Sequence, residues 1–339
     1  MKTPRLLTSI ALGVAACLTL SSCGSSASRP DASASGAGGA ADDVSVLLDW
    51  APNPDHAALY AAQQIGAYQD AGIQVSFTTP SNTADAAREV SLGRVDLAIS
   101  YEPDTLIAVE SGLDVVSVAA LIPTSLTSLV TKAGSGIAGA SDLAGKTIGL
   151  SGLASQEPTI DFIARKAGVN PDSIELPNVQ QSLNQALLTD QVDAIFGAFR
   201  NIEGVELAAQ TDVVVLPATE LGVPDYSELV IIANPKRLET DADYVERVKA
   251  FLAGTAAGQA AAVADSHVAI DALTPQTEGS YEPQVLAAMV EATLALLPAE
   301  DFGKQSAADW ATYASWMFDN RLLEGQVDGA QATTNDYLP

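Results

Sequence analysis

The chain has 339 residues, 47% of them apolar, which is enough for two hydrophobic cores and exceeds the usual size of one domain. It carries 16 Lys and Arg against 42 Asp and Glu, a net charge of −26. This charge repels phosphate backbones and anionic headgroups, which argues against nucleic acid as a partner and against adsorption over a membrane surface. A neutral or cationic small ligand remains compatible.

The first 22 residues have the order of a lipoprotein export signal. Lys2 and Arg5 precede an apolar run from Leu6 to Leu20 that is too short to span a bilayer, and the box LSSC follows at 20–23. In bacterial lipoprotein signals the cysteine at this place becomes the N-terminus and carries the lipid, so we expect lipidation at Cys23. An ordinary secretory signal is the alternative, but the order and spacing favour the lipoprotein.

Residues 23–43 are expected to form a flexible tether, because 24–40 are rich in Ser, Ala and Gly. Cys17 lies within the signal, so we expect no disulfide in the mature chain. Removing residues 1–22 leaves 14 Lys and Arg against 42 Asp and Glu, a net charge of −28.

From Val44 short β-rich runs alternate with amphipathic stretches, and this spacing predicts parallel sheets covered by helices. The first series predicts strands at 44–50, 74–79, 96–101 and 115–121, with helices at 56–72, 83–94 and 102–112. The second predicts strands at 146–152, 173–179, 194–199 and 213–218, with helices at 155–167, 182–191 and 202–210. The segments 86–100 and 183–197 both read as helix, turn, Val-Asp and apolar strand. We therefore expect two α/β lobes built on one plan.

Two apolar segments, 125–133 and 227–235, lie where one series gives way to another region and are expected to join the lobes as hinge strands. After Pro235 helices are expected at 241–265, 282–297 and 306–323, covering the first lobe. The predicted division is lobe 1 at 44–126 plus 232–339 and lobe 2 at 127–231. A ligand cleft is expected between the lobes, outside the carboxyl ends of the strands.

The stretch LDWAPNPDH at 48–56 lies at such a strand end. Asn53 suits a helix N-cap, Pro54 suits the first helical position, and Asp55 in the first turn complements the helix dipole. Capping leaves Asp49, Trp50, His56 and Tyr60 unexplained. An acid, an indole, an imidazole and a phenol at one strand end indicate a ligand site, although a lone histidine at a helix start is more often structural.

Five segments resemble, in order and spacing, the thiamine-pyrimidine precursor binding proteins of bacterial ABC importers. They are LDWAPNPDHAALY, GAYQDAGIQV, ISYEPDTLIAVESGLDVVSVAAL, SDLAGKTIGL and GVPDYSELVIIANP. The wider family includes the eukaryotic thiamine-pyrimidine synthases. The resemblance covers roughly residues 44–254 and implies a type II periplasmic-binding-protein fold, an aminopyrimidine ligand, and permease and ATPase subunits as partners.

An aminopyrimidine ring can stack on Trp50 and on a second aromatic, while carboxylates accept from its amine. Candidate acceptors are Glu102, Glu157, Glu203 and Glu228, with Asn53 and His56 as hydrogen-bonding partners. Glu102 and Glu157 also suit helix starts before proline, and Glu203 could be a solvated helix charge. Glu228 interrupts an apolar segment, so it ranks first with Glu102. The candidate ligand-binding residues are Asp49, Trp50, Asn53, His56, Tyr60, Tyr101, Glu102, Ser155, Glu157, Phe199, Glu203 and Glu228.

Two features depart from the family pattern: Ala58 replaces a common glycine, and Phe199-Arg200 replaces a tyrosine-tryptophan pair. Arg200 is expected to add a positive group near the lobe 2 contacts. The synthases are thought to need an active-site histidine, a lysine for a pyridoxal cofactor and a cysteine-rich iron site, but only Cys23 remains in the mature chain. We therefore expect no enzyme activity, no cofactor and no metal site.

Two alternatives stay open. One is a binding protein for another flat nutrient, such as riboflavin, or for a sulfonate-like or nitrile-derived compound. The other is a lipid-anchored interaction protein without a small ligand, which would leave the hinge and the strand-end aromatics without a role.

Overall fold

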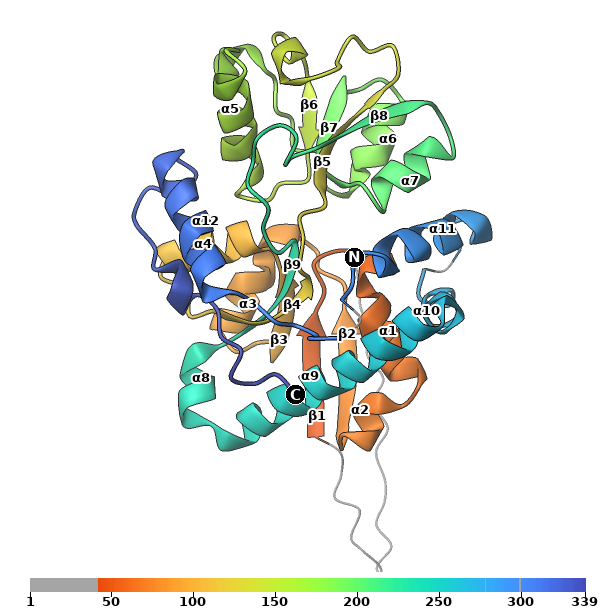
Figure 1. Cartoon of the computed structure of the whole chain (residues 1–339), viewed down its shortest axis with the longest axis vertical. Coiled ribbons are helices and arrows are strands. Elements are labelled where there is room, and N and C mark those ends of the chain that lie inside the picture. The colour runs from red at the N-terminus through yellow and green to blue at the C-terminus, as the bar shows by residue number, and fades with distance from the viewer. Residues whose placement is uncertain (1–41, 278, 299) are drawn as a thin grey trace, which may run out of the picture. The chain divides into compact units, whose positions relative to one another are not determined.

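The computed structural model describes residues 42–277, 279–298 and 300–339 (Figure 1). The expected signal, the lipidation site at Cys23 and nearly all of the expected tether lie outside this range. The first strand begins at Asp42, so it includes the last two residues of the expected tether.

The larger lobe is built on a mixed five-stranded sheet of order β2-β1-β3-β9-β4. β1 pairs in parallel with β2 and β3, whereas β9 runs antiparallel to β3 and β4. The strands are β1 (Asp42–Leu47), β2 (Ile73–Thr78), β3 (Leu97–Ser100), β4 (Val116–Ile122) and β9 (Leu229–Ala233). β3, β4 and β9 are buried along their whole length, as expected for strands covered on both faces.

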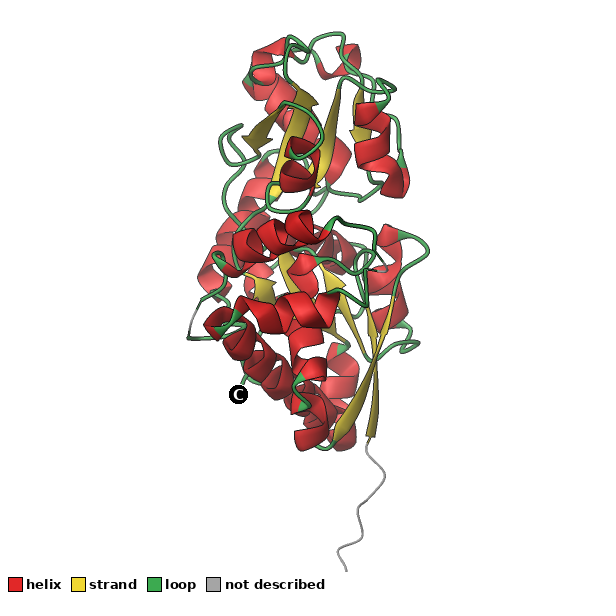
Figure 2. Cartoon of the chain, turned by 90° about the vertical axis from the view of Figure 1, so that its right-hand side faces the viewer, coloured by secondary structure: helices red, strands yellow, loops and turns green. Residues whose placement is uncertain are grey.

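The smaller lobe has a four-stranded sheet of order β6-β7-β5-β8. Its strands are β5 (Thr127–Lys132), β6 (Ile148–Leu150), β7 (Ala194–Phe199) and β8 (Val213–Pro217). β5 runs antiparallel to its two neighbours, as β9 does in the larger sheet, so both sheets share one plan. Figure 2 shows the two groups of strands with helices around each.

The strand expected at 173–179 does not form. This segment lies beside β6 through two isolated bridges, Thr147 with Glu175 and Leu150 with Asn178, in the place that β2 occupies in the larger sheet. Pro177 has no N–H to donate, which accounts for the interrupted pairing.

The segments 125–133 and 227–235 mainly form β5 and β9, one strand in each sheet. The chain therefore passes between the lobes through residues 123–126 and 218–228, which we call the first and second crossings. Each crossing leads into the antiparallel strand of the lobe that it enters.

Helices from both halves of the sequence cover the larger lobe (Figure 1). α9 packs against α1 and α2, and α12 packs against α4. The expected helix at 56–72 is interrupted at Gly66, whose φ of 77° is left-handed, and α10 was not expected. The α-helices of this lobe are α1 (Ala57–Gln64), α2 (Ala67–Asp70), α3 (Ala86–Ser91), α4 (Glu102–Glu110), α8 (Pro235–Thr240), α9 (Ala242–Ala264), α10 (Ser266–Leu273), α11 (Pro283–Leu294) and α12 (Ala307–Asp319).

The smaller lobe carries α5 (Gln156–Lys166), α6 (Leu183–Leu188) and α7 (Glu203–Ala208). Short 3₁₀ turns are η1 (Pro54–His56), η2 (Thr83–Asp85), η3 (Ala140–Asp142), η4 (Pro171–Ser173), η5 (Gln180–Ser182) and η6 (Gly329–Gln331). Among the residues that the structure describes, no helix is both long and apolar enough to cross a membrane.

Candidate functional site

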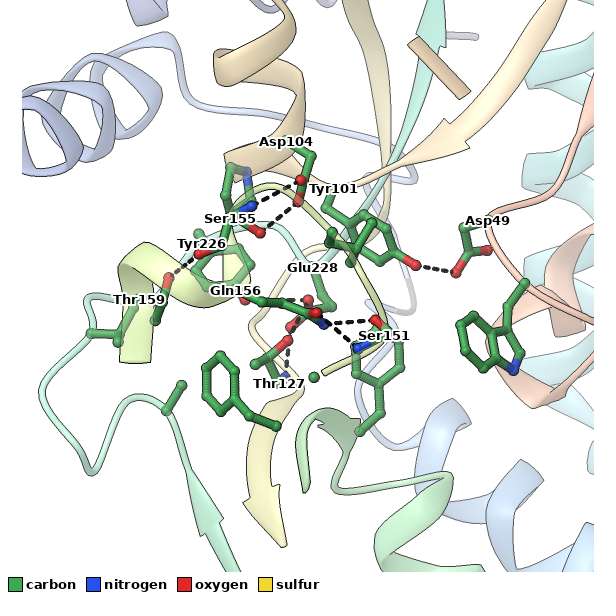
Figure 3. Close-up of a pocket in the computed structure, with 18 of the residues that line it drawn as sticks. Asp49, Tyr101, Asp104, Thr127, Ser151, Ser155, Gln156, Thr159, Tyr226 and Glu228 are labelled. Atoms are coloured by element: carbon green, nitrogen blue, oxygen red, sulfur yellow. Dashed lines mark hydrogen bonds between the residues drawn. The ribbon is translucent and has the colours of Figure 1, made fainter. Parts of the chain in front are cut away.

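A cavity lies between the two lobes, where β1, β3, β6 and β7 end (Figure 3). Asp49 and Trp50 follow β1, Tyr101 follows β3, Ser151 follows β6, and Phe199 ends β7. Carboxyl ends of strands from both sheets thus meet here, as expected for open α/β sheets. The cavity volume is about 40 Å³.

Eight of the twelve candidate residues line this cavity. They are Asp49, Trp50, Asn53, Tyr101, Ser155, Phe199, Glu203 and Glu228. The other four, His56, Tyr60, Glu102 and Glu157, lie outside its wall.

His56 is fully buried beneath the cavity floor and supports Asp49. Its Nδ1 accepts from the Asn53 N–H at 3.3 Å, so its Nε2 carries the proton and donates to Asp49 Oδ1 at 2.8 Å. The Asn53 side chain accepts from the Asp55 N–H at 2.8 Å, which completes a capping box around Pro54. The predicted caps at Asn53 and Pro54 are therefore present. His56 does not line the cavity but holds the Asp49 side chain in place.

Tyr60 packs into the core of the larger lobe, with its ring centroid 5.1 Å from that of Phe77. It lies one helical turn beyond His56, and α1 carries it away from the cavity towards β2.

Glu102 and Glu157 both precede a proline at a helix start, but their surroundings differ. Glu102 is buried and accepts from the Ser227 N–H of the second crossing at 2.8 Å. Glu157 is exposed and lines a surface groove formed mainly by the smaller lobe. In each helix a neighbouring residue reaches the cavity instead, Asp104 in α4 and Gln156 in α5.

Six aromatic residues line the cavity: Trp50, Tyr101, Phe196, Phe199, Tyr226 and Tyr313. Tyr101 and Phe199 meet edge to face across the two lobes, with centroids 6.3 Å apart. Phe196, Tyr226 and Tyr313 were not among the candidates. The sequence around Phe196 is that of an ordinary core strand. Tyr313 lies in α12, where no local feature of the sequence distinguishes it from other buried aromatic residues.

Asp49 is the centre of a polar cluster at the end of β1. Its Oδ1 accepts from His56, and its Oδ2 accepts from the Tyr101 hydroxyl at 2.8 Å (Figure 3). Because a carboxylate offers about four acceptor positions, Asp49 retains capacity for a ligand donor.

Glu203, at the start of α7, presents a second carboxylate. Its Oε2 accepts from the Phe199 N–H at 2.7 Å, which leaves acceptor capacity on the group. Burial raises the pKa of Glu203 to about 7.

Glu228 lies in the wall, but it already binds four donors. Oε2 accepts from the backbone N–H groups of Leu126 and Thr127, and Oε1 accepts from the hydroxyls of Thr127 (2.9 Å) and Tyr226 (3.2 Å). The Glu228 side chain thus links the second crossing to the first. Burial raises its pKa to about 7.

Asp104 connects the lobes directly. Its two oxygens accept from the Ser155 N–H (3.2 Å) and the Ser155 hydroxyl (2.7 Å), as Figure 3 shows. Burial raises the pKa of Asp104 to about 6. Another contact between the lobes runs from the Thr83 hydroxyl to the Ser151 carbonyl at 3.4 Å.

Gln156 forms a polar face of the cavity on the smaller lobe. Its Oε1 accepts from the N–H groups of Ser151 and Gly152, and its Nε2 donates to the Ser151 hydroxyl at 2.7 Å. The amide packs on Gly197, whose φ is 89° and where a Cβ would lie 2.0 Å from Gln156 Nε2. Glycine is therefore required at position 197 for this arrangement.

Arg200 does not contribute its charge to the cavity, contrary to expectation, because its guanidinium binds the Ser125 carbonyl of the first crossing. The cavity wall contains four carboxylates, Asp49, Asp104, Glu203 and Glu228, and within the part of the chain that the structure describes it contains no Lys, Arg or His. Over the same residues no group of three or more His, Cys, Asp or Glu could hold a metal ion. The site favours donors or positive charge on a ligand.

A comparison with solved structures identifies the fold. The periplasmic aliphatic sulphonate binding protein of Escherichia coli is similar over 86% of this chain and 91% of its own, with a TM-score of 0.65 and 16% identity. The expected two-lobe periplasmic-binding-protein fold is thus confirmed.

The relatives that are similar in sequence include the following three. A Haemophilus influenzae protein named for thiamine biosynthesis is 37% identical over 67% of this chain and 71% of its own length. The formylaminopyrimidine-binding protein of Halalkalibacterium halodurans is 30% identical over 85% and 88%. A 4-amino-5-hydroxymethyl-2-methylpyrimidine phosphate synthase of Legionella pneumophila is 26% identical over 87% and 92%.

The family model described as NMT1/THI5 like matches residues 53–269, more than half of the chain and much of both lobes. This chain belongs to the NMT1/THI5-like family.

Proposed function

We propose that the chain is the extracytoplasmic, lipid-anchored substrate-binding component of an ABC importer, and that its ligand is an aminopyrimidine precursor of thiamine. The observation that carries the proposal is the cavity wall, in which aromatic rings and carboxylates occur together and, among the described residues, no cationic side chain is present. The name of the formylaminopyrimidine-binding relative supports the same ligand class.

In this proposal the ring stacks on Trp50, with Phe199 or Tyr101 on its other side, and each stack contributes roughly 1–3 kcal/mol. The exocyclic amine donates to Glu203 or Asp49, the carboxylates with remaining acceptor capacity. Gln156 and Ser151 offer polar atoms to the opposite edge of the ring. Glu228 is not a ligand contact in this proposal, because its four lone-pair positions already accept hydrogen bonds from the protein. Its role is to hold the second crossing against the first.

The alternatives receive less support from this wall. A sulfonate would face four carboxylates, and the described part of the wall offers it no compensating cation. A synthase of the kind that the resemblance implies needs a cysteine-rich iron site, whereas the sequence has two cysteines, Cys17 and Cys23. Riboflavin presents donors and a flat ring, so it remains the competitor to test.

The test is a thermal-shift screen followed by calorimetry, with hydroxymethylpyrimidine, formylaminopyrimidine, riboflavin and an alkanesulfonate as probes. A ligand that binds only the folded state raises the melting temperature according to its concentration relative to Kd. We expect the pyrimidines to raise the melting temperature, and riboflavin and the alkanesulfonate to leave it unchanged. Binding of riboflavin or the sulfonate, with no response to either pyrimidine, would refute the assignment.

The anchor is tested separately in cells. Cys23→Ala is expected to release the protein from membranes or to stall its processing. Normal processing with unchanged membrane retention would contradict lipidation at Cys23 and would leave the ligand proposal intact.

A further inference from the structure

A buried contact between the lobes lies beside the cavity without lining it. Asn201, in the turn between β7 and α7, donates from Nδ2 to Asp55 Oδ1 at 2.6 Å and to Thr293 Oγ1 at 2.7 Å. Asp55 belongs to η1 and Thr293 to α11, both in the larger lobe, and α7 packs against α11. All three side chains are buried, with 3% or less of each exposed.

The other two oxygens of this pair are unsatisfied. Among the residues that the structure describes, neither Asp55 Oδ2 nor Asn201 Oδ1 has a hydrogen-bond partner, although both are buried. An ionised carboxylate and an amide oxygen are both acceptors, so neither can satisfy the other, and each unpaired atom carries a desolvation cost. A proton on Asp55 Oδ2 removes both deficits, because the O–H can donate to the amide oxygen.

We infer that Asp55 is a protonated positioning residue. Its carboxylic acid forms a cyclic pair with the Asn201 amide, in which Asn201 Nδ2 donates to Oδ1 and Oδ2–H donates to Asn201 Oδ1. The pair fixes the turn from Phe199 to Glu203 against the larger lobe.

The surroundings favour the neutral acid. The ionisable groups that act on Asp55 are Asp49 on its own segment, Glu203 on α7, Glu228 on the second crossing, and Tyr281 before α11. All are acidic, and the nearby His56 is held as a neutral donor to Asp49. Burial is the largest cause and raises the pKa of Asp55 well above its usual range; the hydrogen bond from Asn201 lowers it, and the acids Asp49, Glu203 and Glu228 raise it further.

The consequence for binding rests on the proposed function, because Phe199 and Glu203 are proposed ligand contacts. Ionisation of Asp55 turns the second bond of the pair into a repulsion between two acceptors. The turn then loses its fixed place on the larger lobe, and ligand affinity falls at high pH.

The sequence supplies a matched control. Asn53-Pro54-Asp55 recurs as Asn170-Pro171-Asp172 in the smaller lobe, with the same asparagine cap and 3₁₀ turn. Asp172 is exposed. Asp55→Asn keeps a cyclic pair, now amide to amide, without a titrating proton, whereas Asp172→Asn changes only a surface acid.

The experiment uses the full chain without ligand. A negative result would therefore contradict the protonated pair without bearing on the aminopyrimidine proposal. The Asp55 carboxyl carbon, assigned by its loss in Asp55→Asn, is followed by NMR from pH 3 to 9. We expect it to stay protonated well above the ordinary aspartate pKa of about 3.9. Titration near 4 would overturn the inference.

Unfolding curves give the second readout. A carboxyl with a raised folded-state pKa contributes stability that is fully present below its unfolded pKa and is lost as the pH rises through its folded pKa. The folding constant of wild type relative to Asp55→Asn should therefore fall above pH ~4, by up to tenfold per pH unit. Asp172→Asn should follow wild type, and a pH-independent ratio between wild type and Asp55→Asn would contradict the protonated pair.

Discussion

At the residue scale, most polar side chains of the site are held by other side chains or by backbone groups before any ligand is considered. His56 fixes Asp49, the Phe199 N–H fixes Glu203, and three hydrogen bonds fix Gln156. Such support lowers the ordering cost of binding, because fewer rotamers are lost when the ligand arrives.

Trp50→Ala is expected to weaken binding of the aminopyrimidine by roughly 1–3 kcal/mol, the contribution of one lost stack. Trp50→Phe should retain most of the affinity, because a smaller aromatic face remains. Calorimetry measures both variants. Full affinity in Trp50→Ala would exclude stacking on this indole.

Glu203→Gln and Glu228→Gln separate ligand recognition from hinge closure. Glu203→Gln replaces a charged acceptor by a neutral one, so we expect about 1 kcal/mol less affinity with little change in stability. Glu228→Gln places an amide against four donors and should lower the unfolding free energy by about 1–3 kcal/mol. Calorimetry and urea unfolding test this division, and the reverse pattern would make Glu228 the ligand acceptor.

At the element scale, the first turn of each cleft helix decides which side chain reaches the cavity. α4 and α5 both begin near a Glu-Pro pair, yet Asp104 and Gln156 line the cavity while Glu102 and Glu157 do not. Each residue turns the side chain by about 100° around a helix axis, so neighbours face different surroundings.

Glu102→Gln tests the buried start of α4. Burial raises the pKa of Glu102 to about 7. The stability from its neutral form is present below the unfolded pKa of about 4.3 and is lost as the pH rises through 7. The stability of Glu102→Gln relative to wild type should therefore increase between these values, by up to ~1.4 kcal/mol per pH unit.

Urea unfolding at several pH values measures this change. Glu157→Gln, at the matching but exposed Glu-Pro site, should show no such increase. Equal pH profiles for the two variants would contradict the role of burial at Glu102.

Gly197→Ala tests the contact of β7 with α5. The added Cβ displaces Gln156 from three hydrogen bonds and adds about 1–2 kcal/mol of left-handed backbone strain. Gly168→Ala is the control, since its φ of 75° carries the same strain but no atom lies within 4 Å of the new Cβ. Gly197→Ala should be the less stable of the two and should lose ligand affinity, and equal unfolding curves would contradict the contact.

At the scale of the whole molecule, the lobes are joined by two crossings and held together by polar contacts at Asp104–Ser155, Thr83–Ser151 and Asp55–Asn201. A cavity of about 40 Å³ holds only a few water molecules, at roughly 10–15 Å³ each. A ligand of the size of a pyrimidine therefore needs the lobes to separate before it enters.

Since entry requires an open ligand-free state, small-angle scattering should show a smaller radius of gyration with ligand than without it. A ligand that touches both lobes favours the closed state by its differential contacts. Ser155→Ala, which removes the 2.7 Å bond to Asp104, should shift the ligand-free ensemble towards the open state. An unchanged profile at ligand saturation would count against closure.

The sequence by itself determined the α/β alternation, the shared plan of the two lobes and the strand ends that meet at the cavity. These features depend on local periodicity and on turn residues, which can be read from neighbouring positions. It also located the cap at Asn53 and Pro54, because a cap uses only atoms within one turn.

Only the tertiary structure decided which side chains line the cavity. From the sequence we predict that Asp55 complements the helix dipole. In the structure its buried side chain accepts a hydrogen bond from Asn201, 146 positions away. Glu228 lines the cavity, as the sequence predicts, but its carboxylate also binds the first crossing. Asp104, Gln156 and Tyr313 line the wall although the sequence does not indicate them. The physical reason is that the same local sequence can have different surroundings. The Asn-Pro-Asp turn of the larger lobe packs against the smaller lobe, whereas the aspartate of the Asn-Pro-Asp turn in the smaller lobe is exposed to solvent.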